Sequence, residues 1–280
     1  MNVIRNLSLR YKLIFIFLFL AVLSAFGIYS LRWFIVTELA NDVLPTQALV
    51  SEFGQLVTDV RAEALEYVAL GEAETAEDYA GTAAELLALG PELGSLGNDP
   101  GEGEVFAASE ATALSIVDVG QQVITAHDET LALLETLAEV EEEKEVAETN
   151  LDTAALAAES PQAIELLAQM KSQAEHIHTE TLEYTLSAGA AALEELDEYY
   201  FSFGQSMAAM QGELAAGNVS QPTEVEAVAD QYAEIVALSP QITASHAETL
   251  VLLEELEELE GWSQEIRLSL LELADNDAQT

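Results

Sequence analysis

The sequence predicts an all-α protein in which one N-terminal transmembrane helix precedes an internally duplicated, antiparallel helical bundle. Three observations support this prediction: the composition, a single uncharged apolar run near the N-terminus, and a set of short motifs that return in order. Half of the 280 residues are hydrophobic but only 7% are aromatic, and Gly and Pro are few. Such a composition is typical of helical chains and is too apolar for a disordered acidic one.

The charge excludes several classes of function. The chain has 51 Asp and Glu against 8 Lys and Arg, which gives a net charge of −43, and it has no Cys. Nucleic acid and anionic lipid surfaces attract cationic proteins, so neither is an expected partner of this chain. The lack of Cys excludes disulfides and thiolate chemistry. No phosphate-binding loop, dinucleotide fingerprint or nucleophile elbow occurs, so we expect neither an enzyme nor a cofactor.

The apolar run at 13–31 reads LIFIFLFLAVLSAFGIYSL and contains no charge. As a helix it would be about 28 Å long, close to the thickness of a hydrocarbon core. Bases precede the run and acids follow it, so the positive-inside rule places the N-terminus in the cytoplasm and the remaining chain outside. The alternative is a cleaved signal peptide, for which Ala25-Phe26-Gly27 offers only a weak cleavage site.

Short motifs beyond residue 37 return 117 to 121 positions later. EALEY at 63–67 returns as ETLEY at 180–184, and ITAH at 124–127 returns as ITASH at 242–246. Two homologous halves explain this order. The predicted domains are a cytoplasmic stub and membrane anchor at 1–36, a first helical repeat at 37–156 and a second at 157–280.

Each repeat is predicted to contain three helices. Pro45 suits a first helical turn, Gly71 ends that helix, and Ser160 is an expected N-cap before Pro161. Turn residues at 97–101 and 217–222 predict loops. The predicted helices cover 45–70, 75–96 and 104–157 in the first repeat, and 162–187, 191–216 and 223–274 in the second.

The N-terminal order of motifs resembles a known family. The basic start NLSLRYKL at 6–13 leads into the apolar run, and Leu44-Pro45 and the motif EYVALGE at 66–72 follow. This order resembles the sensory regions of bacterial chemoreceptors and sensor histidine kinases, of the helical bimodular type with two stacked four-helix bundles. The resemblance implies a domain outside the inner membrane, anchored in the bilayer by 13–31. It also implies a homodimer that binds a small organic acid or a periplasmic binding protein and passes a helix displacement across the membrane.

A second hypothesis is a single-span structural or adaptor protein that pairs with another membrane protein. A second membrane helix, a HAMP linker and an output domain do not follow within the 280 residues, and this favours the adaptor.

Four residues are the predicted ligand contacts: Arg61, Tyr67, His178 and Tyr184. Arg61 is the only base between positions 33 and 143, and His178 stands at the matching place in the second repeat. Arg recognises carboxylates through two parallel hydrogen bonds, which suits an organic acid. Tyr67 and Tyr184 each follow these cations by six positions. The alternative is that the cations form ordinary ion pairs and the tyrosines pack between helices.

Two further histidine patterns have a chemical interpretation beside a structural one. Glu175 and His178 have the Glu-x-x-His spacing of carboxylate-bridged metal bundles, but the first repeat lacks a copy, so no metal is expected. His127 and His246 lie on apolar stripes, where packing is the simpler interpretation and a pH response is the alternative.

Overall fold

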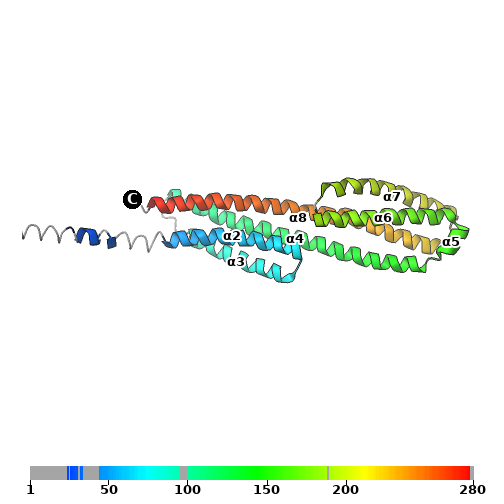
Figure 1. Ribbon diagram of the computed structural model, residues 1–280, viewed down its shortest axis with the longest axis horizontal. Helices are drawn as coiled ribbons and strands as arrows, with labels where there is room; N and C mark the ends of the chain where they lie inside the picture. The colour runs from blue at the N-terminus through cyan, green and yellow to red at the C-terminus, as the bar shows by residue number, and fades with distance from the viewer. Residues whose placement is uncertain are drawn as a thin grey trace, which may run out of the picture. The chain divides into compact units, whose positions relative to one another are not determined.

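The computed structural model describes residues 24, 26–30, 32–33, 44–94, 100–187 and 189–277. Helices make up almost all of this part of the chain (Figure 1), and no strand occurs in it, which confirms the all-α prediction for these residues. The helices are α2 (Leu44–Leu70), α3 (Ala73–Gly94), α4 (Pro100–Asn150), α5 (Thr153–Glu159), α6 (Pro161–Ser187), α7 (Ala190–Ala216) and α8 (Pro222–Asp277).

The predicted transmembrane helix at 13–31 requires a correction. Among the described residues, no helix is both long enough and apolar enough to cross a membrane. Within the apolar run only Ser24 and Phe26–Ser30 are described, and they are helical. The rest of the run lies outside the described residues. The placement of the bulk outside the cell membrane depended on this helix and stays a prediction.

Several helix ends lie where the sequence predicts them. Helix α2 ends at Leu70, and Gly71 follows with φ +65°, its N–H donating to the Tyr67 carbonyl at 2.7 Å. Helix α7 ends at Ala216, and Gly217 follows with φ +71°. Glycine adopts this left-handed conformation without the steric cost that a Cβ would add, so it ends both helices.

The predicted third helix is wrong at its end. The sequence predicted one helix from 104 to 157, but α4 ends at Asn150 and α5 begins at Thr153. Asp152 causes the break, because its carboxylate accepts hydrogen bonds from the N–H groups of Ala154 and Ala155 at 3.1 and 3.0 Å. Asp is a preferred N-cap because it satisfies the free N–H groups of a first helical turn.

Ser160 lies at the predicted N-cap position, directly before α6 begins at Pro161, but its side chain bonds elsewhere. Its hydroxyl donates to the Asn218 carbonyl at 2.8 Å and accepts from the Ser220 N–H at 3.0 Å. The side chain therefore holds the loop between α7 and α8, while its backbone carbonyl receives the first hydrogen bonds of α6.

The chain divides by packing into two compact units. Unit 1 is Met1–Asp59, Thr82–Ser115 and Leu259–Thr280, and unit 2 is Val60–Gly81 and Ile116–Glu258. The predicted repeats at 37–156 and 157–280 concern an internal duplication of the sequence. The division into packing units does not test them. Helices α2 and α6 each have 27 residues, and their first residues, Leu44 and Pro161, are separated by the offset of the repeated motifs.

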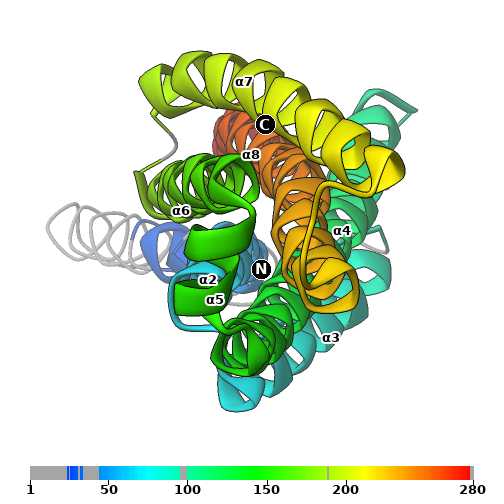
Figure 2. The ribbon, with the colours of Figure 1, turned by 90° about the vertical axis from the view of Figure 1, so that its right-hand side faces the viewer.

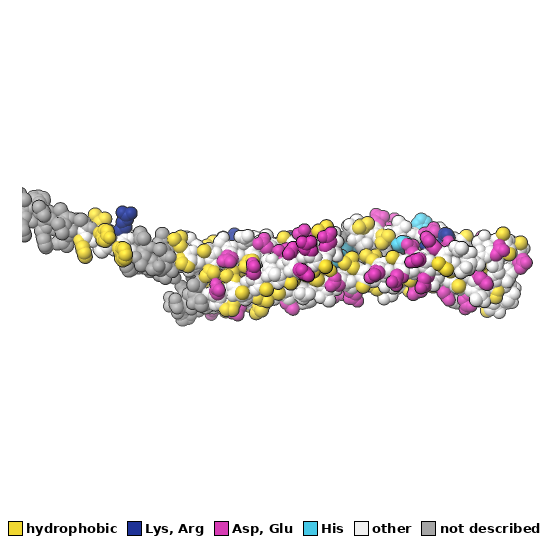
Figure 3. Space-filling model, turned by 90° about the horizontal axis from the view of Figure 1, so that it is seen from below, with side chains coloured by type: hydrophobic (Ala, Val, Ile, Leu, Met, Phe, Trp, Pro, Cys, Tyr) yellow, Lys and Arg dark blue, Asp and Glu magenta, His cyan; other side chains and the backbone are white. Residues whose placement is uncertain are grey.

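Unit 2 has a hydrophobic core of its own. Figure 2 shows α6, α7, α8 and the second part of α4 around a common centre. The fully buried side chains there come from α5, α6, α7 and α8: Leu156, Met170, Ile177, Leu196, Met210 and Val225. Acidic side chains are spread over the face seen in Figure 3, as expected for the solvated sides of amphipathic helices.

Candidate functional site

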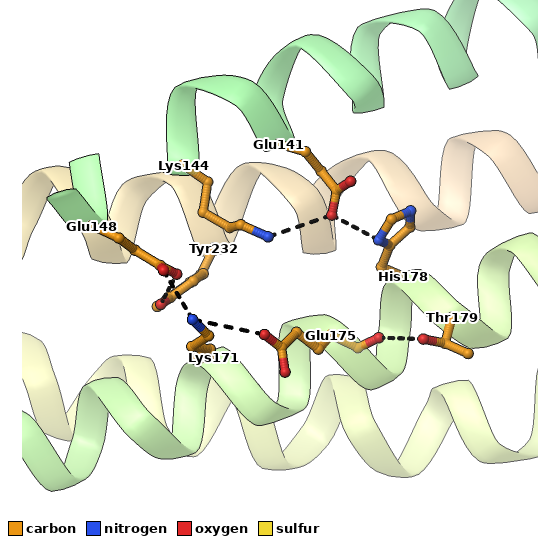
Figure 4. Close-up of polar contacts among 8 residues, drawn as sticks. All are labelled: Glu141, Lys144, Glu148, Lys171, Glu175, His178, Thr179 and Tyr232. Atoms are coloured by element: carbon orange, nitrogen blue, oxygen red, sulfur yellow. Dashed lines mark hydrogen bonds and ion pairs between the residues drawn. The ribbon is translucent and has the colours of Figure 1, made fainter. Parts of the chain in front are cut away.

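A network of ion pairs joins α4 to α6 within unit 2 (Figure 4). On α4, the Lys144 ammonium lies 3.4 Å from a carboxylate oxygen of Glu141. The Nδ1 atom of His178, on α6, lies 2.8 Å from the same oxygen. Glu141 therefore connects a base on its own helix with an imidazole on the neighbouring one.

The second part of the network adds α8. Glu148 on α4 lies 2.9 Å from the Lys171 ammonium on α6, and the Tyr232 hydroxyl on α8 donates to Glu148 at 2.7 Å. Glu175 lies 3.9 Å from the same ammonium, one helical turn further along α6. Three helices thus meet at the single carboxylate of Glu148.

The protonation states in this part of the network are fixed by its contacts. Burial raises the pKa of Glu148, but the hydrogen bonds from Lys171 and Tyr232 lower it by more, so this carboxyl is held ionised. The hydrogen bond to Glu148 raises the pKa of Lys171 in return, although burial opposes this. Burial and the neighbouring carboxylate both raise the pKa of Tyr232, so it remains a hydroxyl donor.

A pocket of about 220 Å³ opens beside Glu148, Lys171 and Tyr232. Its remaining wall is mostly aliphatic and comes from the end of α4, the start of α5, α6 and α8: Leu151, Thr153, Ile164, Leu167, Ala168 and Val228. A mostly apolar cavity with a few converging polar groups is the usual form of a small-molecule site, although this one is smaller than most. The pocket is therefore the candidate binding site in the described part of the chain.

Of the predicted contacts, His178 lies in the ion-pair network and Arg61 does not. The Arg61 guanidinium on α2 is 3.1 Å from the carboxylate of Glu257 on α8. Neither Arg61, Tyr67 nor Tyr184 lines the pocket of unit 2. The four predicted residues are thus not gathered around this cavity, and their role as ligand contacts stays a prediction.

The two predicted tyrosines occupy matching positions against the two histidines of the apolar stripes. The ring of Tyr67 meets His127 edge-on, with centroids 5.6 Å apart and planes at 83°. Tyr184 meets His246 in the same way, at 5.5 Å and 85°. The Tyr67 hydroxyl also donates to Asp128. Burial, together with this hydrogen bond, raises the pKa of Tyr67 to about 12.

Hydroxyl groups link α4 to α8 next to these rings. The Thr130 and Ser245 hydroxyls lie 2.9 Å apart, and Ser245 also donates to the Ala126 carbonyl at 3.1 Å. Nearby helices are joined in a similar way by Ser239, whose hydroxyl contacts those of Thr181 and Tyr200. We call the histidines, their tyrosines and the Thr130–Ser245 pair the central polar layer.

The metal hypothesis finds no support in the described residues, where no group of three or more His, Asp or Glu could hold an ion. Glu175 and His178 have the right spacing, but they face different partners. Glu175 lies near Lys171, while His178 contacts Glu141.

Sequence reasoning missed Glu148, Lys171 and Tyr232. Lys171 carried a signal, because it is one of only four bases after residue 37. Glu148 carried none, since it is one carboxylate among 51 acids. Comparison with known proteins adds no assignment: no family model matches the chain, and no curated protein is significantly similar to it.

Proposed function

We propose that this chain is a helical sensory module that binds a small organic ligand in the pocket of unit 2. The observation that supports this function is the position of the pocket against Glu148, where α4, α6 and α8 are joined by Lys171 and Tyr232. A ligand in the pocket would contact the same groups that hold these helices together.

The expected response is a small displacement of α4 relative to α6 and α8 within unit 2. Packed helices shift by about 1–2 Å in many switching proteins, because their interfaces have discrete arrangements. The ion pair between Glu148 and Lys171 spans 2.9 Å, so a shift of that size would break or replace it. This proposal keeps the sensory role and the homodimer implied by the family resemblance, and it omits the transmembrane helix.

Ligand binding should be detectable as thermal stabilisation of the full chain. A ligand at 100 times its dissociation constant stabilises a native protein by about 2.7 kcal/mol. For a chain of this size, each kcal/mol corresponds to about 2–4 °C in melting temperature, so we expect a rise of at least about 5 °C. The screen should include small organic acids, amines and alcohols.

A variant that fills the pocket tests the location. Ala168 is exposed and lines the pocket, so Ala168→Phe would occupy the cavity at little cost to folding. Ala209 on α7 is also exposed and lies outside the lining, which makes Ala209→Phe the matched control. Equal ligand-induced shifts in both variants, or none in the wild-type chain across the whole screen, would contradict the proposed function.

Two exposed apolar side chains favour a second candidate, an adaptor that pairs with another protein. Leu186 near the end of α6 is 88% exposed and Phe201 on α7 is 72% exposed. An adaptor would use such side chains, so the double change Leu186→Ser and Phe201→Ser would remove a co-purifying partner. Under the sensory proposal the same change would leave the ligand-induced stabilisation intact.

A further inference from the structure

We propose that the ligand of this pocket is a small aliphatic amine, whose ammonium takes the place of the Lys171 ammonium between Glu148 and Glu175. This inference rests on the proposed function, because it names the chemical class of the ligand for the same pocket. Lys171 acts in this site as a cation that is tethered to the protein. Its ammonium occupies the polar end of the site until a free cation replaces it.

The charges at the polar end favour a cation over an anion. Glu148 and Glu175 both lie within 4.0 Å of the Lys171 ammonium, so two carboxylates share one base. The adjoining part of the network, Glu141 with Lys144, adds one charge of each sign. The site therefore keeps an excess negative charge, and the whole chain carries −43. Such a field raises the local concentration of cationic ligands and repels carboxylates.

The hydrogen-bond inventory also favours an amine. The Tyr232 hydroxyl already donates its only proton to Glu148, and Lys171 donates to the other oxygen of the same carboxylate. Each carboxylate oxygen can accept more than one hydrogen bond, whereas a hydroxyl has one proton to give. An incoming ammonium thus finds free acceptor capacity on the Glu148 carboxylate.

Lys171 is able to leave. Its side chain is 43% exposed, and it makes one close contact at 2.9 Å and one longer contact at 3.9 Å. A lysine stem is long and flexible, so the ammonium can turn into water while the ligand takes over the contact with Glu148. Glu148 would keep a cationic partner throughout the exchange, which avoids leaving a partly buried charge unpaired.

The lining sets the size of the apolar part. The aliphatic wall of Leu151, Ile164, Leu167 and Val228 surrounds a volume of about 220 Å³. At about 30 Å³ per water-sized group, this volume holds roughly seven non-hydrogen atoms. An unbranched amine of about four to six carbons matches that size. Each added methylene that becomes buried should improve affinity about fourfold.

The test is isothermal titration of the full chain at neutral pH with butylamine and hexylamine, and with hexanoate and hexanol as matched probes. We expect both amines to bind, hexylamine more tightly, and hexanoate not to bind. The variant Lys171→Met removes the competing cation and keeps the aliphatic stem, so hexylamine should bind it several-fold more tightly. Glu148→Gln should weaken hexylamine at least about tenfold, since a charge-assisted contact is lost.

Glu145→Gln is the control for charge, because Glu145 lies on the same helix, is exposed and does not line the pocket. It should leave hexylamine affinity nearly unchanged. Circular dichroism of every variant checks folding, and Glu175→Gln provides a second carboxylate variant with a partial loss of affinity if Glu148→Gln unfolds.

The outcomes separate this inference from the proposed function. Binding of hexanoate that Lys171→Met abolishes would overturn the amine and leave a pocket that senses an organic acid. Amine binding that Lys171→Met weakens would overturn the exchange of cations. If amines, acids and alcohols all fail to bind the wild-type chain, the proposed sensory function falls together with the inference.

Discussion

His127 and His246 are the residues whose surroundings constrain their chemistry most. They are only 8% and 6% exposed, and the Nδ1 atom of His127 has no hydrogen-bond partner among the residues that the structure describes. Burial lowers the pKa of both side chains, and the proximity of His246 lowers that of His127 further. Asp128 acts in the opposite direction on His127, while Tyr67 and Tyr184 present neutral ring edges. Burial thus favours the neutral form of both imidazoles in the native state.

We expect the native state to lose stability as the pH falls below about 6.5, the ordinary pKa of histidine. The pKa of each imidazole is lower when folded, so the unfolded chain binds more protons there and acid shifts the equilibrium towards it. Above that pH the contribution is fully present. Guanidinium unfolding followed by circular dichroism between about pH 8 and about pH 5 measures the effect.

The double variant His127→Leu and His246→Leu should flatten this dependence. His176 provides the control, since it is exposed and stacks flat on Tyr199 at a centroid distance of 4.8 Å. His176→Gln should retain the wild-type slope. A slope that survives in the double variant would show that other groups produce it.

The packing of α3 against α4 depends on a close approach at Gly120. A Cβ at this position of α4 would lie 2.5 Å from the Tyr79 hydroxyl and 2.8 Å from its ring. Tyr79 on α3 is 1% exposed, and its hydroxyl donates to the Val117 carbonyl at 2.7 Å. The absence of a side chain at Gly120 therefore lets the tyrosine lie directly on the backbone of α4.

Gly120→Ala should destabilise the protein by about 1–3 kcal/mol, the usual cost of overpacking a buried contact. Gly212 lies inside α7 with nothing within 4 Å of an added Cβ, so Gly212→Ala is the matched control. Alanine favours a helix over glycine by roughly 0.5–1 kcal/mol, and the control should gain stability. Urea midpoints measure both, and equal shifts in the two variants would contradict the contact.

The helices were largely predictable because their ends depend on local chemistry. Pro45, Gly71 and Gly217 act through backbone geometry, which sequence reveals directly. The break at Asp152 was missed, since one acid in a Glu-rich helix looks like any other until its carboxylate is seen to cap Ala154. The apolar run at 13–31 misled for a related reason. Its apolar composition indicates a preference for a hydrocarbon environment. Only part of the run is described, however, and no described helix can span a membrane.

The candidate site was less predictable than the fold, because it depends on which helices meet. The four predicted contacts stand out in the sequence as scarce cations and as tyrosines at repeated positions. The structure joins His178 to Glu141 and pairs each tyrosine with a histidine. The pocket depends on Glu148 and Tyr232, which are 84 positions apart and share no motif.

The whole molecule carries far more negative charge than its ion pairs compensate. Net charge is −43, and most acids lie on exposed helix faces such as those in Figure 3. Like charges repel in the compact state more than in the unfolded chain, so the repulsion opposes folding.

The melting temperature should therefore rise with ionic strength. Between about 0.01 M and about 1 M salt the Debye length falls from about 30 Å to about 3 Å, which screens repulsion between exposed carboxylates. Differential scanning calorimetry in sodium chloride measures the change, with an uncharged osmolyte as the control for solvent exclusion. A melting temperature that falls with salt would show that attractive pairs such as Arg61 with Glu257 outweigh the repulsion.

Helix α4 is one unbroken helix from Pro100 to Asn150, although its residues belong to two different cores. An α-helix turns by about 100° per residue, so removing one residue near Ser115 would rotate the azimuth of everything that follows. Phe106 is buried before that point of the helix and Leu137 is buried after it. Inserting seven residues, nearly two full turns, would restore the phase. A one-residue deletion there changes the azimuth by about 100° and a seven-residue insertion by only about 20°, so we expect the deletion to lower the melting temperature more.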